Sequence, residues 1–88
     1  MRAIMTVTGR DRTGIVATVA TKLAEHHANI ANISQTIMSD YFTMIVEIVL
    51  PAELDIADLQ GDMRKLGERE ALEIHVQSEA IFDAMHRL

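Results

Sequence analysis

The residues best able to hold a small molecule lie in the segment of residues 9–16, GRDRTGIV. A strand pattern precedes Gly9 and a helical pattern follows it, so the segment is predicted to be a strand-to-helix turn. The N-terminus of a helix exposes unpaired backbone N–H groups and carries a partial positive charge, and both favour a carboxylate. Gly14 leaves space for a ligand beside the backbone, while Arg10 and Arg12 could add charge for an anion. We therefore expect this turn to bind a small-molecule ligand.

The same turn also has a purely structural explanation. Glycines at such a turn often serve backbone geometry alone, either Asp11 or Thr13 could cap the helix, and arginines there are usually solvated. The spacing of Gly9, Asp11 and Gly14 is not a phosphate-binding fingerprint, because a P-loop needs Gly-Lys-Ser/Thr and a Rossmann turn needs a third glycine. No Ser-His-Asp, Cys-His or paired-carboxylate arrangement stands out, so no enzymatic activity is predicted.

A second group of polar candidates lies in the next predicted strand. Asn29, at its start, can both donate and accept hydrogen bonds and could therefore read the α-ammonium or α-carboxylate of an amino acid. Alternation along the strand places Asn32, Ser34 and Thr36 on one face and Ile33 on the other. The polar row could line a ligand pocket, form a polar interface or be an ordinary exposed edge.

Hydrophobic periodicity predicts four strands and three helices. The expected strands cover residues 2–8, 29–38, 41–50 and 72–77, and the expected helices cover residues 13–27, 56–66 and 79–88. Asp55 is predicted to cap the second helix and Ser78 the third, and Gly67 is predicted to follow the end of the second helix. The whole chain is expected to form one domain, residues 1–88, with a core at residues 2–78 and a C-terminal helix at residues 79–88.

The order of the elements predicts the topology. Two right-handed β-α-β crossovers joined by a hairpin at Ser39-Asp40 give an α+β, ferredoxin-like sandwich with an antiparallel sheet in the order 4-1-3-2. The first and third strands are central in that order, and they carry apolar residues on both faces, such as Ile4 with Met5 and Ile45 with Met44. The sheet face away from the two main helices is therefore expected to be partly covered, by the C-terminal helix or by another subunit.

Composition narrows the possible partners. The net charge of −5 argues against nucleic acid. The hydrophobic share of 49% is high for a chain of 88 residues and suggests a second buried face in an oligomer. No apolar run is long enough to span a membrane and the start is too polar for a signal peptide, so we expect a cytoplasmic protein. The adjacent histidines His26 and His27 would point about 100° apart on a helix, so neither a metal site nor a cofactor is predicted.

Several pieces of the sequence, at the right intervals, resemble an ACT domain. These pieces are Gly9, Asp11, Gly14, Ile15 and Val16, then Asn29-Ile30, Ile33-Ser34-Gln35-Thr36 and Asp40-Tyr41-Phe42-Thr43-Met44. The similarity covers almost the whole chain, through Ile81-Phe82. It points to the stand-alone single-ACT proteins related to the glycine-cleavage repressor.

The resemblance implies a regulatory module that binds a small molecule, usually an amino acid, and performs no chemistry on it. The ligand would lie between the subunits of a homodimer, beside the first strand-to-helix turn and the second strand, and the regulated protein would be reached in trans. The expected ligand contacts are Asp11, Arg12, Thr13, Gly14, Ile15, Val16 and Asn29, with Asn32 and Ser34 behind them. The alternative is an interaction module whose fold serves only dimerisation or docking, without a ligand.

Ferredoxin-like folds also host RNA recognition and acyl-phosphate hydrolysis. The first strand has no aromatic residue and the chain is acidic, which argues against RNA. An acylphosphatase needs an arginine in the first loop and an asparagine to position water, and this chain has both, but its flanking sequence does not resemble that family.

Overall fold

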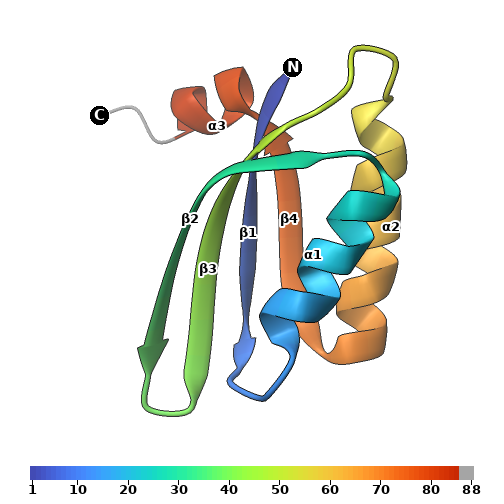
Figure 1. Cartoon of the computed structure of the whole chain (residues 1–88). Coiled ribbons are helices and arrows are strands. Elements are labelled where there is room, and N and C mark those ends of the chain that lie inside the picture. Colours follow the sequence, from blue (N-terminus) through green and yellow to red (C-terminus); the bar gives the residue numbers. More distant parts are fainter. Residues whose placement is uncertain (86–88) are drawn as a thin grey trace.

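The elements of the computed structural model, which describes residues 1–85, follow the predicted order (Figure 1). The strands are β1 (Arg2–Arg10), β2 (Asn29–Met38), β3 (Tyr41–Val49) and β4 (Leu72–Ser78), and the helices are α1 (Ile15–Glu25), α2 (Ile56–Glu70) and α3 (Glu79–Met85). The last three residues of the predicted C-terminal helix, 86–88, lie outside the described residues.

The four strands form one antiparallel sheet in the order β2-β3-β1-β4, which confirms the predicted topology. Helices α1 and α2 lie together on one face, and α3 contacts β1 and β4 away from them (Figure 1). β1 and β3 are central, as their two apolar faces predicted, and β2 and β4 are the edges. On the face away from α1 and α2, Ile4 and Val49 are half-buried, whereas Ile45 stays 45% exposed.

The core lies between the sheet and the two long helices, and its side chains follow the predicted periodicities. Alternate residues of β1 and β3 meet the stripes of α1 and α2. The buried set is Ala3, Met5, Val7, Ile15, Val19, Leu23, Phe42, Met44, Val46, Ile48, Leu50, Leu59, Met63, Leu66, Leu72, Ile74 and Val76. Three methionines, Met5, Met44 and Met63, are thus fully buried members of the core.

The predicted caps at the ends of α2 and α3 are partly confirmed. The Asp55 carboxylate accepts from the Ala57 N–H at 3.0 Å, and the Ser78 hydroxyl accepts from the Ile81 N–H at 3.3 Å. Gly67, however, lies inside α2, and the left-handed residue that ends this helix is Ala71, with φ 58°. Gly67 is needed there for close packing, because a Cβ at this position would meet the Leu72 carbonyl oxygen at 2.5 Å.

Two boundaries also differ from the prediction. Gly9 does not break β1, which continues to Arg10; a Cβ on Gly9 would meet a Leu72 methyl group at 2.6 Å, so this glycine allows close packing within the strand. Helix α1 ends at Glu25 and not at residue 27, because His27 takes the left-handed conformation and the Ala28 N–H closes back onto the Leu23 carbonyl at 3.0 Å.

Candidate functional site

The turn between β1 and α1 lies at the same end of the sheet as the β2–β3 hairpin (Figure 1). The Asp11 N–H donates to the Asp40 carbonyl at 2.7 Å, which ties the two turns together. The Arg10 guanidinium lies 5.6 Å from the centre of the Tyr41 ring, within the range of a cation–π contact. These contacts hold the backbone of the turn in a fixed position relative to the sheet.

The start of α1 exposes backbone donors. Gly14 is the N-cap, with φ 91° and no side-chain cap hydrogen bond, so the predicted capping by Asp11 or Thr13 is wrong. Because Gly14 itself occupies the N-cap position, neither the Asp11 nor the Thr13 side chain is placed to cap the helix. Within the described residues, the N–H groups of Ile15 and Val16 have no acceptor. The space beside Gly14 is open, because a Cβ built there would meet nothing within 4 Å.

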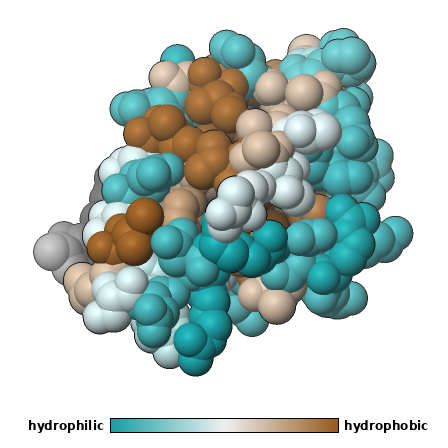
Figure 2. All heavy atoms as spheres, turned by 60° about the horizontal axis from the view of Figure 1, so that its bottom comes forward, coloured by the Kyte–Doolittle hydropathy of each residue, from teal (hydrophilic) through white to brown (hydrophobic). Residues whose placement is uncertain are grey.

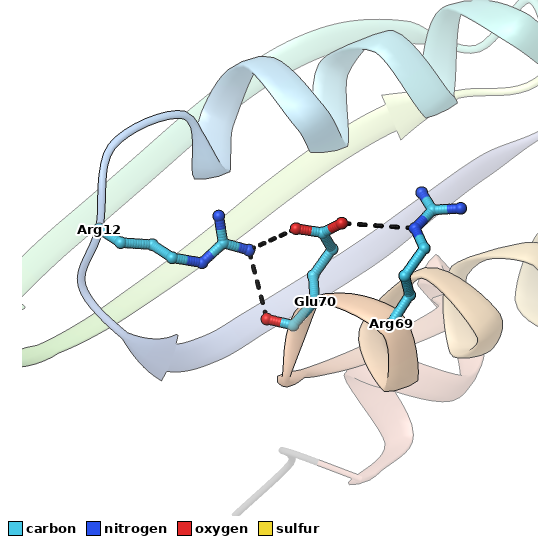
Figure 3. Close-up of polar contacts among 3 residues, drawn as sticks. All are labelled: Arg12, Arg69 and Glu70. Atoms are coloured by element: carbon cyan, nitrogen blue, oxygen red, sulfur yellow. Dashed lines mark hydrogen bonds and ion pairs between the residues drawn. The ribbon is translucent and has the colours of Figure 1, made fainter.

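The Arg12 side chain points towards the end of α2 and is paired with Glu70 there (Figure 3). Its guanidinium donates to the Glu70 carboxylate at 2.7 Å and to the Glu70 main-chain carbonyl at 3.2 Å. Arg69 contacts the other carboxylate oxygen at 3.3 Å. The hydrogen bond from Arg12, followed by that from Arg69, lowers the pKa of Glu70 below its ordinary value. The charge of Arg12 is thus largely compensated, and the turn is anchored on α2.

Asn29 lies at the other end of the sheet from the turn. It pairs with Val49, which in turn pairs with Arg2, whereas the turn follows Arg10. A strand rises about 3.3 Å per residue, so Asn29 and the turn of one chain are about 25 Å apart. Asn29 and the turn of one chain are this far apart because α1 carries the chain along the full length of the sheet before β2 begins.

Asn32 and Ser34 lie on the face of β2 away from α1. They pair with Glu47 and Ile45, whose side chains are on that face, and a bulge between Ile30 and Asn32 sets this register. The Asn32 side chain accepts from the Ile33 N–H at 2.9 Å. The structure therefore does not bring Asn32 and Ser34 together with the turn.

An exposed apolar strip on β2 is the feature that the sequence analysis missed. Every residue of β2 is exposed. Ile30, Ile33 and Ile37, which we call the β2 strip, pair with residues that face α1 and α2, yet they are 37%, 41% and 54% exposed. The spacing of these isoleucines is visible in the sequence, but the same spacing is equally typical of a strand face that is buried in the core.

The exposed side chain of Val16 extends this apolar surface onto α1. Thr18, Lys22 and Glu25 line a groove towards α2. Val16 is on the opposite side of the buried face of α1 from these three residues, which is the side towards β2. Its side chain is 38% exposed. Figure 2, in which the end with the two turns comes forward, shows a larger hydrophobic patch and a smaller, separate one on an otherwise largely hydrophilic surface.

Other chemistry is sparse in the described part of the chain. No cluster of three or more His, Cys, Asp or Glu residues among residues 1–85 has the geometry of a metal site. His26 contacts the Asp62 carboxylate at 2.7 Å where α1 and α2 meet, and His75 is exposed beside Glu73. None of the helices described here is long and apolar enough to cross a membrane.

Comparison with known proteins gives consistent matches. The ACT domain pattern matches residues 2–77. A UPF0237 protein of Streptococcus mutans serotype c is 49% identical over 88 residues, which cover 100% of both chains. The solved ACT domain protein from Streptococcus pneumoniae superposes with a TM-score of 0.85 at 42% identity, over 98% of each chain. A putative glycine cleavage system transcriptional repressor shares the fold, with a TM-score of 0.78 at 16% identity over 86% of this chain and 45% of its own.

Proposed function

The chain belongs to the ACT domain family, within the UPF0237 group, and from this premise we propose that it is a non-catalytic regulatory module that binds an amino acid or a similar small metabolite as a homodimer. ACT domains are generally regulatory ligand-binding modules. The protein regulated by this one would be reached in trans.

The observation that carries the proposal is the uncapped start of α1. The N–H groups of Ile15 and Val16 face no acceptor within residues 1–85, and the space beside Gly14 is open. Two aligned donors at the positive end of a helix suit a carboxylate. Ile15 is buried to 2% exposure, so its side chain holds these amides in place. Asp11 and Thr13 are exposed beside them and are available to an α-ammonium group.

The β2 strip supports a homodimer formed along the β2 edge. Long apolar edge strands are usually covered, because they otherwise pair with other chains. A two-fold axis beside β2 makes the two copies of the strand antiparallel and joins the two sheets into one. The strip and Val16 of each copy would then be buried in the interface.

The same symmetry gives Asn29 a place in the site. In an antiparallel pair, the start of β2 of a second copy lies beside the end of β2 of the first copy, which is the end near the turn. Asn29 of a second copy would thus approach Gly14, although the two residues of one chain lie at opposite ends of the sheet. Asn32 and Ser34 face the other side of the sheet, so we assign them no contact with the ligand, and Arg12 acts by positioning the turn.

The alternative, a dimerisation or docking module without a ligand, is favoured by one observation. Arg12 is already paired with Glu70, so the turn offers an anion less charge than its sequence suggests. The two functions are separated by a thermal-shift screen of the dimeric protein against the twenty amino acids, followed by calorimetry. A stabilising ligand supports the regulatory site, and a flat response from a properly dimeric sample contradicts it.

A further inference from the structure

A groove runs along the sheet edge opposite β2, between α2 and β4. It has a volume of about 700 Å³ and is lined by residues of α2 from Gln60 onwards and by β4 from Leu72 to Gln77. Among the strands of residues 1–85, β4 pairs only with β1, so no strand lies along its second edge. This groove is distinct from the turn and from the β2 strip.

The backbone of β4 offers strand-pairing groups to this groove. The Val76 carbonyl accepts a hydrogen bond from the Gln60 side-chain amide at 2.6 Å, so it points away from β1. In a strand, the N–H and C=O of one residue point to the same side, and residues two apart share that side. Ile74 and Val76 therefore present N–H groups to the groove, and the Gln60 amide occupies the position of a neighbouring strand's N–H.

The floor of the groove is apolar and incompletely covered. The side chains of Leu72, Ile74 and Val76 retain 7%, 8% and 5% exposure, whereas every other core side chain is at 3% or less. The three most exposed members of the core thus all belong to the strand that lines the groove. An added strand with apolar side chains on this face would cover them.

The charges along the groove change sign from one end to the other. Arg64 lines the groove and has no ion pair within residues 1–85. Its guanidinium points back along α2, because it lies 3.9 Å from the position of a Cβ on Gly61. Glu68 lines the opposite end, where α2 meets Leu72. The Glu73 side chain is on the other face of β4, beside His75, and does not contribute to this pattern. This pattern complements an extended segment that has an acidic side chain at one end and a basic one at the other.

We propose that the groove binds an extended segment of another protein, which adds to β4 as an antiparallel fifth strand. Its acidic side chain lies opposite Arg64, and its basic side chain, on the same face of the added strand, lies opposite Glu68. Main-chain hydrogen bonds supply the affinity in this mode of recognition, and side chains on alternate positions supply the specificity. The docking site does not depend on a ligand at the turn and gives the module a surface for a partner that is separate from the β2 edge.

The test uses a mixture of capped octapeptides in which Val, Ile and Thr vary at random and a glutamate precedes a lysine by four residues. An NMR titration should shift the amide signals of Ile74 and Val76 and slow their hydrogen exchange. N-methyl groups placed on one edge of the peptides should abolish these effects, and those on the other edge should leave them. No response at β4, a response centred on β2, or equal effects of the two methylated sets would overturn the proposal.

Three variants locate the site more finely. Arg64→Glu should weaken binding at least about threefold, because it removes an attraction and adds a repulsion, whereas Lys65→Glu, with the same charge change outside the groove, should not. Gln60→Ala should tighten binding, because the side-chain amide no longer competes for the Val76 carbonyl. Equal weakening by the two charge reversals, or weaker binding by Gln60→Ala, contradicts this geometry.

Discussion

Arg12, in the turn before α1, donates to both the carboxylate and the main-chain carbonyl of Glu70, the last residue of α2, across 58 residues of sequence. A cation at the end of a helix is favourable because it satisfies a terminal carbonyl and interacts with the helix dipole. The position of the proposed ligand turn therefore depends on where α2 ends (Figure 3).

The pair of Arg12 and Glu70 should make stability depend on pH. Arg12 lowers the pKa of Glu70 in the folded state, so the pair stabilises the protein above the ordinary glutamate pKa, and this stabilisation is lost as the pH falls through the lowered value. Glu70→Gln should therefore unfold more easily than the wild type at neutral pH. The difference should shrink as the pH falls below the ordinary glutamate pKa of 4.5, and it should vanish once the pH is below the lowered pKa of Glu70. Urea unfolding across this range measures it.

Glu68→Gln is the matched control for the pH experiment. Glu68 lies on the same helix and has no ion pair within the described residues, so its substitution should give little difference at any pH. A loss of stability in Glu70→Gln that is equal at neutral and acidic pH would contradict the role of the ion pair.

The two glycines inside α2 should respond in opposite ways to alanine. Alanine is normally favoured over glycine within a helix by about 1 kcal/mol. Gly61→Ala should show this gain, because its new Cβ would meet only the Arg64 guanidinium at 3.9 Å. Gly67→Ala should instead lose about 1–3 kcal/mol, because its Cβ would meet the Leu72 carbonyl oxygen at 2.5 Å. Denaturant unfolding of both variants decides this, and a gain from both would show that the corner beside Gly67 is loosely packed.

Gly67 also illustrates which parts of the fold can be predicted from sequence. The stripe of α2 and the alternation of β4 are local patterns, so the elements and their order were predicted correctly. A glycine that follows a helix and a glycine that admits a neighbouring carbonyl look the same in sequence. Only the contact with Leu72 distinguishes them, and the same holds for Gly9 in β1.

The candidate site could be predicted only where it depends on local structure. The turn and its exposed amides follow from a strand pattern that changes to a helix pattern. Asn29 is far from Gly14 because β2 begins at the end of the sheet opposite the turn. The order of the elements implies this separation, although the two residues are only 15 positions apart in the sequence. The exposure of Ile33 and Ile37 could not be predicted, because it depends on how far α1 reaches over the sheet edge.

The dimer should depend on the β2 strip. Ile33→Lys places a charge in the proposed interface and should weaken dimerisation by at least about tenfold, because a buried unpaired charge is costly. Ile45→Lys is the control, since Ile45 is similarly exposed, 45% against 41%, but lies on the other face of the sheet. Analytical ultracentrifugation compares the two variants. A dimer that survives Ile33→Lys and dissociates in Ile45→Lys would place the interface on the open face.

Ligand binding should depend on the backbone amide of Val16. Val16→Pro removes this N–H, and proline is tolerated in the first turn of a helix. We expect the amino acid identified by the screen to bind at least about tenfold more weakly, because a hydrogen bond to a charged group is lost. Val16→Ala keeps the N–H but removes the side chain from the proposed dimer interface, so it should bind normally at protein concentrations at which ultracentrifugation shows both variants to be dimeric. Calorimetry measures both, with the Tm of each variant as a check of folding; equal affinities would exclude the amides as the carboxylate site.

If the site joins the turn of one copy with Asn29 of another, two weakly binding variants should restore strong binding when they are mixed. Val16→Pro alone lacks the Val16 N–H of the turn, and Asn29→Ala alone lacks the amide side chain, so each homodimer should bind at least about tenfold more weakly than the wild type. When both are unfolded and refolded together, half of the dimers are mixed, and each mixed dimer has one complete site and one site that lacks both features. Binding should therefore return to about a quarter of the sites, as counted by calorimetry. Each variant refolded alone is the control. If a mixture shown to contain mixed dimers recovers no binding, the proposed site between two copies is wrong. A site within one chain could not replace it, because about 25 Å separates Asn29 from the turn, which is too far for one small ligand to contact both.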